Sequence, residues 1–241
     1  GEQIEQLKEK DALRRKLVAH VSHDLRTPLA SMQGHLETLQ LKSGSFSDEE
    51  REQFLQTTIT QGWRLSRLVN ELFELSSLDA KEQAPDREPF AANELVYDVV
   101  QKRQLEAAQK NLSLSVNAAN HLPMAYGDLA MTERVMDNLM DNAFAHTPAG
   151  GRVEVQLKVE QSSVNVSVIN SGPGIPKEAL AHLFEPFYRA EEGLNRSHAG
   201  LGLAIAKRIM ELQKGSLEAF NGSDGGAVFR FSLPLFRGQG E

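Results

Sequence analysis

The first third of the chain repeats apolar side chains at intervals of mostly three and four residues. This spacing constrains the fold more than any other feature of the sequence. It is typical of an amphipathic helix in a bundle or coiled coil. In residues 2–42 it predicts one long helix, in which Pro28 removes a backbone donor and introduces a kink. Charged residues separate the apolar positions, which are Ile4, Leu7, Leu13, Leu17, Val21, Leu25 and Met32.

A second helix is predicted to follow a loop at residues 42–50. Ser47 and the three acids after it form a helix-start signal, and the pattern continues to about Asp79. Two helices joined by a short loop form an antiparallel hairpin, which buries little apolar surface alone. We therefore expect two copies to pair as a four-helix bundle in a homodimer, with a hairpin packed inside a monomer as the alternative. The apolar positions of this helix are Phe54, Ile59, Leu65, Leu68, Val69, Leu72, Leu75 and Leu78.

The sequence changes character after residue 81. Residues 82–91 are polar and contain two prolines, a composition typical of a linker. Residues 153–159 then alternate apolar and polar side chains strictly, which predicts a sheet with one buried face. The predicted fold class is α+β: a helical hairpin in residues 1–81, and in residues 92–236 a two-layer α/β sandwich with helices on one sheet face. Strands are predicted at 112–116, 152–160, 164–169, 216–220 and 228–233, and helices at 94–109, 128–146, 177–183 and 201–214.

Composition argues against several classes of function. The net charge is −7, whereas a dominant nucleic-acid-binding surface needs clustered Lys and Arg. The absence of cysteine excludes disulfides and thiolate metal sites. No stretch approaches the roughly 18 apolar residues of a membrane-spanning helix, and GEQIEQLKEK does not have the pattern of a signal peptide. Because the chain begins inside a helical pattern, we expect it to be part of a longer protein.

Three polar residues lie along one stripe of the helix predicted at 128–146. Asn138, Asn142 and His146 are four residues apart, and the other faces of the helix are apolar. Asparagine is a poor interior helix former, so the stripe predicts a ligand-binding surface; a solvated face is the alternative. Asparagine oxygens suit a hard cation such as Mg²⁺, which shares the phosphates of a nucleotide.

Two glycine clusters follow. NSGPGIP at 170–176 comes directly after a predicted strand, so its glycines permit a tight turn and a close approach of backbone to a flat ligand. HAGLGLAIAK at 198–207 places Gly200 and Gly202 before a helix, whose first N–H groups can hold phosphate oxygens. Between the clusters, residues 183–198 form a loop of lid-like length. Each cluster alone is weak evidence, since Gly-x-Gly occurs in many ordinary turns.

The motifs taken together resemble a known family. HVSHDLRTPL at 20–29, the Asn-x-x-x-Asn helix, NSGPGIP, LFEPFYR and HAGLGLAIAKRI occur in the order and spacing of the cytoplasmic core of bacterial sensor histidine kinases. In that family they are the H, N, G1, F and G2 boxes. The resemblance covers nearly the whole chain. It implies a dimerisation and histidine phosphotransfer domain followed by an ATP-binding domain of the gyrase and chaperone type.

The resemblance implies roles for four residues of the first motif. His23 resembles the phosphoacceptor, and Asp24 the residue that accepts its proton or orients its ring. Thr27 matches the position that aligns a hydrolytic water in members that also dephosphorylate their partner. Arg26 is sited to meet phosphate or an acid of the ATP-binding domain. His20 lies three residues before His23, so the two side chains point about 60° apart around the helix. Both histidines therefore cannot aim alike at one ATP, and we expect His20 to be a bystander.

Other residues resemble the site for ATP and Mg²⁺. Asn142 matches the metal ligand, and Asn138 and His146 its neighbours at the phosphates. The wider superfamily has a glutamate that activates water where Asn138 stands; an amide is not basic, so Asn138 favours transfer over hydrolysis. The adenine turn is implied at Asn170, Gly172 and Gly174, the lid hinge at Gly200, Leu201 and Gly202, and a lid contact at Arg189.

Two positions depart from the family pattern. Asn170 stands where an aspartate accepts a hydrogen bond from adenine, and a neutral acceptor binds more weakly than a charged one. Ala145 stands where Lys or Arg is usual, with Arg189 and Arg196 as candidates to replace the lost phosphate contact. Both departures predict weaker ATP binding.

The implied activity is ATP-dependent phosphorylation of His23, with transfer to an aspartate of a response regulator and dephosphorylation of that partner. The alternatives are a phosphatase-dominant or pseudokinase module, a freestanding ATPase, and a dimerisation scaffold. The resemblance also implies a cytoplasmic fragment whose full-length protein has an upstream sensor segment and an anchor in the inner membrane.

Overall fold

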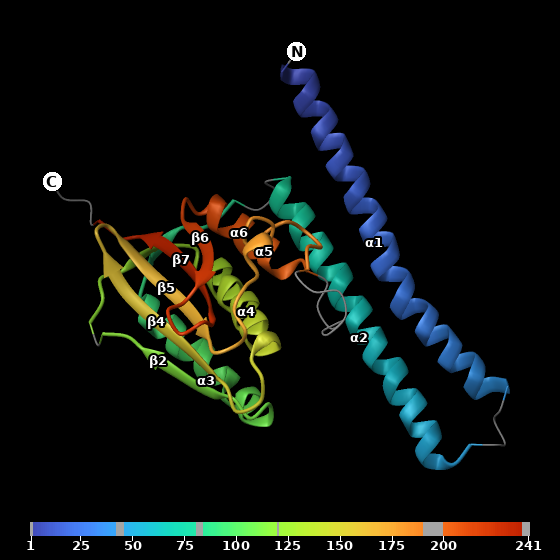
Figure 1. Ribbon diagram of the computed structural model, residues 1–241. Helices are drawn as coiled ribbons and strands as arrows, with labels where there is room; N and C mark the ends of the chain where they lie inside the picture. Colours follow the sequence, from blue (N-terminus) through green and yellow to red (C-terminus); the bar gives the residue numbers. More distant parts are fainter. Residues whose placement is uncertain (1, 42–45, 81–83, 120, 190–199, 238–241) are drawn as a thin grey trace. The chain divides into compact units, whose positions relative to one another are not determined.

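The computed structural model describes residues 2–41, 46–80, 84–119, 121–189 and 200–237 (Figure 1), with side chains from residue 19 onward. The chain divides into two compact units within its second helix, after Glu74. The domain limits at 81 and 92 remain predictions. None of the helices in the described ranges is long and apolar enough to cross a membrane.

The N-terminal unit is a hairpin of two long helices. Helix α1 spans Glu2–Leu41 and helix α2 spans Asp48–Asp79, and Figure 1 shows them running in opposite directions. The His35 ring of α1 packs edge-on against the Phe54 ring of α2, with ring centroids 5.4 Å apart. Helix α1 is continuous through Pro28, whose side chain is buried. The predicted hairpin is thereby confirmed, while residues 42–45 of its loop lie outside the described residues.

The start of α2 is fixed by a reciprocal pair of hydrogen bonds. The Glu50 backbone N donates to the Ser47 hydroxyl at 3.2 Å, and the Ser47 backbone N donates to the Glu50 carboxylate at 2.9 Å. This capping box satisfies two backbone donors that the first helical turn leaves without partners. The helix start predicted at Ser47 is therefore confirmed.

A five-stranded sheet forms one layer of the second unit, in the order β2-β4-β5-β7-β6. The pair β2–β4 is parallel and the other pairs are antiparallel. Val153, Val155 and Leu157 are buried, while the polar residues between them lie on the more exposed face. The buried face predicted from the alternation is therefore present at these three positions, whereas Val159, the fourth apolar position, is exposed. The strands are β2 Ser113–Asn117, β4 Arg152–Glu160, β5 Ser163–Asn170, β6 Ser216–Asn221 and β7 Ala227–Pro234.

Three helices form the other layer, on one face of the sheet (Figure 1). They are α3 Ala92–Gln109, α4 Leu129–His146 and α6 Gly202–Leu212. Val135, Leu139 and Ile205 are fully buried, because each points from its helix into the core between the layers. The Asp128 carboxylate caps α4 by accepting from the Met131 backbone N at 2.9 Å. The predicted α/β sandwich is confirmed.

Two short strands were not predicted. Strand β1, Glu88–Phe90, pairs antiparallel with strand β3, Ala125–Gly127, in a separate two-stranded sheet. Three residues are too few to show an alternation, and Pro89 within β1 argues against a strand in the sequence. Part of the segment interpreted as a linker at 82–91 is therefore a strand. Helix α5, Lys177–Leu180, is shorter than the helix predicted at 177–183.

Candidate functional site: an exposed histidine and a nucleotide-type pocket

His23 projects from the middle of α1, and its side chain is 78% exposed. The Nδ1 atom lies 3.2 Å from the Asp24 carboxylate. A carboxylate only accepts hydrogen bonds, so this contact favours the tautomer with its proton on Nδ1 and its lone pair on Nε2. The arrangement therefore presents a nucleophilic nitrogen on an exposed imidazole.

The residues that follow His23 lie on the same stretch of helix. Thr27, one turn later, is exposed and donates its hydroxyl to the His23 carbonyl oxygen at 3.2 Å. Arg26 is also exposed. Proline has no N–H, so Pro28 cannot donate the helical bond that the Asp24 carbonyl would otherwise accept. Helix α1 thus places the four predicted residues His23, Asp24, Arg26 and Thr27 within little more than one turn.

The polar stripe of α4 lies beside the start of α6. Asn138 is 5% exposed, and its Nδ2 has no hydrogen-bond partner among the described residues. A Cβ at Gly202 would lie 3.3 Å from the Asn138 Oδ1, so these two predicted residues are neighbours. Asn142 is half-buried, and His146 is exposed at the end of the helix. A buried donor without a partner is costly, so the Asn138 amide suits a ligand that brings an acceptor such as a phosphate oxygen.

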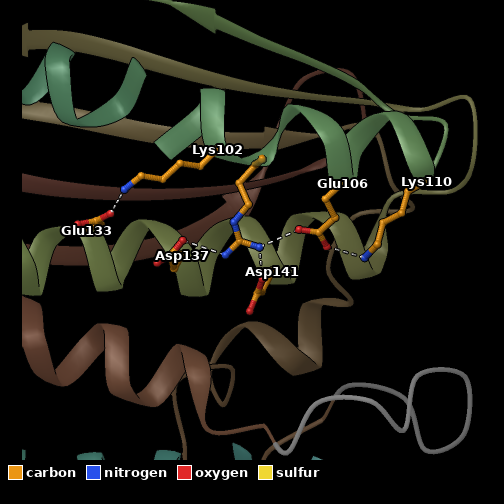
Figure 2. A network of polar contacts seen from close by, with 7 residues as sticks. Lys102, Glu106, Lys110, Glu133, Asp137 and Asp141 are labelled. Carbon is orange, nitrogen blue, oxygen red and sulfur yellow. Dashed lines mark hydrogen bonds and ion pairs between the residues drawn. The ribbon is translucent and has the colours of Figure 1, made fainter. Parts of the chain in front are cut away.

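An ion-pair network holds the face of α4 next to this stripe (Figure 2). The Arg103 guanidinium of α3 donates to Asp137 at 2.8 Å and to Asp141 at 2.7 Å, and it also reaches Glu106 at 2.9 Å. Burial lowers the pKa of Arg103, but the hydrogen bonds that its guanidinium donates to these acids outweigh burial and raise the pKa above its ordinary value. Because Asp137 and Asp141 each precede an asparagine of the polar stripe, the network fixes the helix that carries that stripe.

The loop after β5 is closely packed, as predicted for the first glycine cluster. A Cβ at Gly172 would collide with the His146 carbonyl oxygen, so only glycine allows this approach. Gly174 has φ +76°, in the left-handed region, and a Cβ there would lie 2.5 Å from the Gly225 carbonyl oxygen. The turn is thereby pressed between the end of α4 and the β6–β7 connection.

Asn221, which ends β6, anchors the same turn and was not predicted as a site residue. Its Oδ1 accepts from the Ile175 backbone N at 2.7 Å, and its Nδ2 donates to the Ile175 carbonyl at 2.9 Å. The sequence signals this poorly, because Asn221 is 46 positions from Ile175.

Asn170 is 4% exposed, at the end of β5. Its Oδ1 accepts from the Ala227 backbone N at 3.2 Å. Its Nδ2 donates to the Thr147 hydroxyl at 3.3 Å, and the His146 carbonyl lies 3.5 Å away. The structure thus brings Asn170 to the end of α4, next to the predicted residue His146.

The second glycine cluster begins α6. Gly200 has φ +74°, and its carbonyl accepts from the Phe187 backbone N at 2.9 Å. Leu201 is fully buried and its carbonyl accepts from the Ile205 backbone N, which starts the helix. Arg189 is half-buried at the end of the described segment. Residues 190–199 of the predicted lid, including Arg196, lie outside the described residues.

The chemistry of these residues fits a nucleotide. Backbone approaches closely at Gly172, Gly174 and Gly202, and Asn138 offers a donor. Within the described ranges there is no group of three or more His, Asp or Glu residues able to hold a metal ion alone. A cation here would therefore share Asn142 with phosphate oxygens and water, which is the usual coordination of Mg²⁺.

Comparison with known proteins gives two family matches. Residues 13–81 match the "His Kinase A (phospho-acceptor) domain". Residues 127–237 match the family described as "Histidine kinase-, DNA gyrase B-, and HSP90-like ATPase".

Two relatives align over most of this chain. The chain is 33% identical over 230 residues to the sensor protein KdpD of Clostridium acetobutylicum, covering 94% of this chain and 25% of that protein. It is also 33% identical over 223 residues to the sensor histidine kinase RppB of Synechocystis sp., covering 92% of this chain and 49% of that protein. The chain thus spans between a quarter and a half of the length of these relatives.

Solved structures agree in fold. The Acinetobacter baumannii histidine kinase AdeS superposes with a TM-score of 0.72 at 25% identity, covering 89% of this chain and 98% of that one. Full-length ShkA in complex with AMPPNP superposes with a TM-score of 0.66 at 25% identity, covering 91% of this chain and 46% of that one. The histidine kinase ThkA in complex with the response regulator TrrA has the same fold, with a TM-score of 0.78 at 24% identity, covering 98% of this chain and 66% of that one. The chain therefore belongs to the histidine kinase family and carries its catalytic core, a phosphoacceptor hairpin followed by an ATP-binding domain.

Proposed function

We propose that the chain phosphorylates its own His23 with ATP and then transfers the phosphoryl group to an aspartate of a response regulator. The observation that carries the proposal is the exposed His23 imidazole, with Nδ1 held 3.2 Å from Asp24, inside a matched phosphoacceptor domain. The chain also carries the ATP-binding domain that supplies the phosphoryl donor.

Asp24 suits His23 to this reaction. The His23 Nε2 lone pair attacks the γ-phosphorus, a P–N bond forms, the bond from the γ-phosphorus to the bridging oxygen breaks, and ADP leaves with that electron pair. The imidazole then carries a positive charge, and its Nδ1 proton passes to the Asp24 carboxylate 3.2 Å away. Asp24 thus both selects the nucleophilic tautomer and takes up the proton.

The pocket residues position ATP in this proposal. Asn138 donates to a phosphate oxygen, and His146 and Arg189 flank the phosphates. Gly172 and Gly174 with Asn170 hold the base, while Gly200, Leu201 and Gly202 form the hinge of the lid. Asn142 would ligate Mg²⁺, which neutralises charge on the phosphates when it is bound. Because an Asn138 amide cannot deprotonate water, ATP persists until His23 reaches it.

The response regulator is the proposed partner, and Thr27 is proposed to reverse the signal. One kinase with this fold was solved with a response regulator, which supports the choice of partner. Thr27 is exposed one turn from His23, where its hydroxyl can orient a water toward a phosphorylated partner once it leaves the His23 carbonyl.

We also propose that the chain is a homodimer. Helix α1 exposes Leu29 and Leu36, and α2 exposes Ile59 and Trp63, which is 74% exposed. The two leucines of α1 are about two turns apart, and Ile59 and Trp63 of α2 are about one turn apart. Such exposed apolar positions on two paired helices suit a four-helix bundle with a second copy. Sedimentation should give twice the chain mass, and Ile59→Glu should shift it toward the monomer. The full-length protein is proposed to be anchored in the inner membrane, with its signal entering through α1.

Incubation with γ-³²P-labelled ATP and Mg²⁺ tests the proposal. Wild type should acquire label that is acid-labile and base-stable, and His23→Gln should abolish it. His20→Gln is the matched control, since His20 lies on the same helix three residues away and should keep the label. Steady release of phosphate that His23→Gln leaves unchanged would instead identify a freestanding ATPase.

A phosphatase-dominant module is the second candidate, which Asn170 and Ala145 favour because both remove charge from the nucleotide site. It predicts no label on His23, together with dephosphorylation of the regulator that Thr27→Ala abolishes.

A further inference from the structure

The amide of Asn170 is held in one orientation by two groups of opposite character. The Ala227 backbone N–H only donates, so it requires the Asn170 oxygen, which lies 3.2 Å away. The Thr147 hydroxyl spends its single hydrogen on the Ala143 carbonyl at 2.6 Å. Toward Asn170, 3.3 Å away, it can therefore only accept, and it requires the amide nitrogen. A flipped amide would set N–H against N–H at Ala227 and oxygen against oxygen at Thr147.

The nitrogen end of this amide is already covered. Its two hydrogens face the Thr147 hydroxyl and the His146 carbonyl, 3.5 Å away. A Cβ at Gly172 would lie 2.7 Å from the same nitrogen, so the turn lies directly against it. The oxygen end accepts only one bond, from Ala227, and an amide oxygen has two lone pairs. Among the described residues, the Asn170 side chain therefore has one oxygen lone pair without a partner, and both hydrogens of its nitrogen are occupied. It can accept a hydrogen bond from a ligand but cannot donate one.

We propose that Thr147 is a specificity-determining residue, which acts by fixing the Asn170 amide so that only its oxygen is available to a purine. This deepens the proposed function, because it assumes that the base of ATP lies at Asn170. A 6-amino purine donates a hydrogen to that oxygen. A 6-oxo purine sets a second oxygen against it and is rejected. Thr147 thereby allows an uncharged residue at position 170 to retain selection for adenine.

Calorimetry with ADP and with inosine diphosphate tests this directly. The two bases differ at position 6, which is amino or oxo, and at the adjoining N1, which carries a hydrogen only in the 6-oxo base. Wild type should prefer ADP. Thr147→Val keeps the shape but removes the acceptor, so the amide can rotate, and the ratio of the two affinities should fall roughly fivefold, the value of one hydrogen bond. Thr147→Ser keeps the hydroxyl and should restore the ratio. Thr147→Ala gives the same comparison if the valine variant does not fold.

Thr132→Val is the matched control. Thr132 is also buried in α4 and donates to the carbonyl four residues earlier, Asp128, at 2.7 Å. It makes no hydrogen bond to Asn170 among those described, so its loss should leave the ratio unchanged. Equal weakening of ADP and inosine diphosphate in Thr147→Val would overturn the proposal, as would a wild type that does not discriminate. Failure of the wild type to bind either nucleotide would overturn the proposed function as well. If the wild type labels His23 but the ratio of the two affinities is unchanged in Thr147→Val, only the role of Thr147 is overturned.

Discussion

In the proposed nucleotide site, Asn138 stands where a general base would activate water in a hydrolase. It is buried, its Nδ2 lacks a partner within the described structure, and its Oδ1 lies close to Gly202, where a Cβ would come within 3.3 Å of it.

Replacing Asn138 should therefore convert transfer into hydrolysis. In Asn138→Glu a carboxylate can take a proton from water, so phosphate release from ATP should rise at least roughly tenfold. This is a cautious lower bound, because general-base catalysis typically contributes roughly 100-fold or more. Asn138→Gln has the same length without a basic group and should not raise the rate. Measurement of phosphate release in the His23→Gln background isolates the effect, and equal rates for the Glu and Gln variants would contradict it.

The site residues that could be predicted are those whose signal is local. Asn138, Asn142 and His146 share a helical stripe, and Gly174 and Gly200 sit in turns with positive φ. Asn221 and Thr147 could not be found in this way. Asn221 forms hydrogen bonds with Ile175, and Thr147 forms one with Asn170. Both contacts exist only because the fold brings distant segments of the chain together.

Among the helices and strands, α4 depends most on a contact that the sequence does not reveal. Arg103 reaches it from α3 across 34 and 38 residues, to Asp137 and Asp141. Both acids look like ordinary surface charges in the sequence. In the structure they share one guanidinium, so they hold α4 against α3 in a fixed rotation (Figure 2).

Arg103→Met should lower stability by about 1–3 kcal/mol, because it leaves two half-buried carboxylates facing each other without a cation. Thermal unfolding should show a decrease of several degrees in Tm. Lys102→Met, which breaks the exposed pair with Glu133, is the control and should change Tm little.

The pH range also follows from these cations. The pKa values of Lys102 and Arg103 are raised by their acidic partners, first of all Glu133 for Lys102, while Arg103 is raised despite the opposing effect of burial. A raised pKa means that the stabilisation is complete below the unfolded value and is lost only as pH rises through the folded one. For Arg103 that loss begins only above the already high ordinary pKa of a guanidinium, so the Arg103→Met difference should be flat between pH 7 and 9. A marked dependence in that interval would contradict the assignment.

The long helices and the longer strands could be predicted because each repeats its signal over several turns or alternations. The short elements could not. Strands β1 and β3 have three residues each, and they are held by pairing with each other rather than by a pattern of their own. The Pro89 ring even argues against the strand in which it lies.

At the scale of the whole molecule, two units divide one reaction. In the proposed function the hairpin carries the nucleophile His23 and the α/β sandwich carries the nucleotide site, and the two belong to different compact units. The polar segment after residue 81, the strand patterns beyond it and the order of the motifs predicted this division.

The nitrogen that receives the phosphoryl group is the most direct test of this account. A chain labelled with ¹⁵N-histidine, incubated with ATP and Mg²⁺ and examined at alkaline pH by ³¹P–¹⁵N correlated NMR, should show phosphorus bonded to Nε2 of His23, because Asp24 holds the proton on Nδ1. Phosphorus on Nδ1, on His20, or on no histidine at all would contradict it.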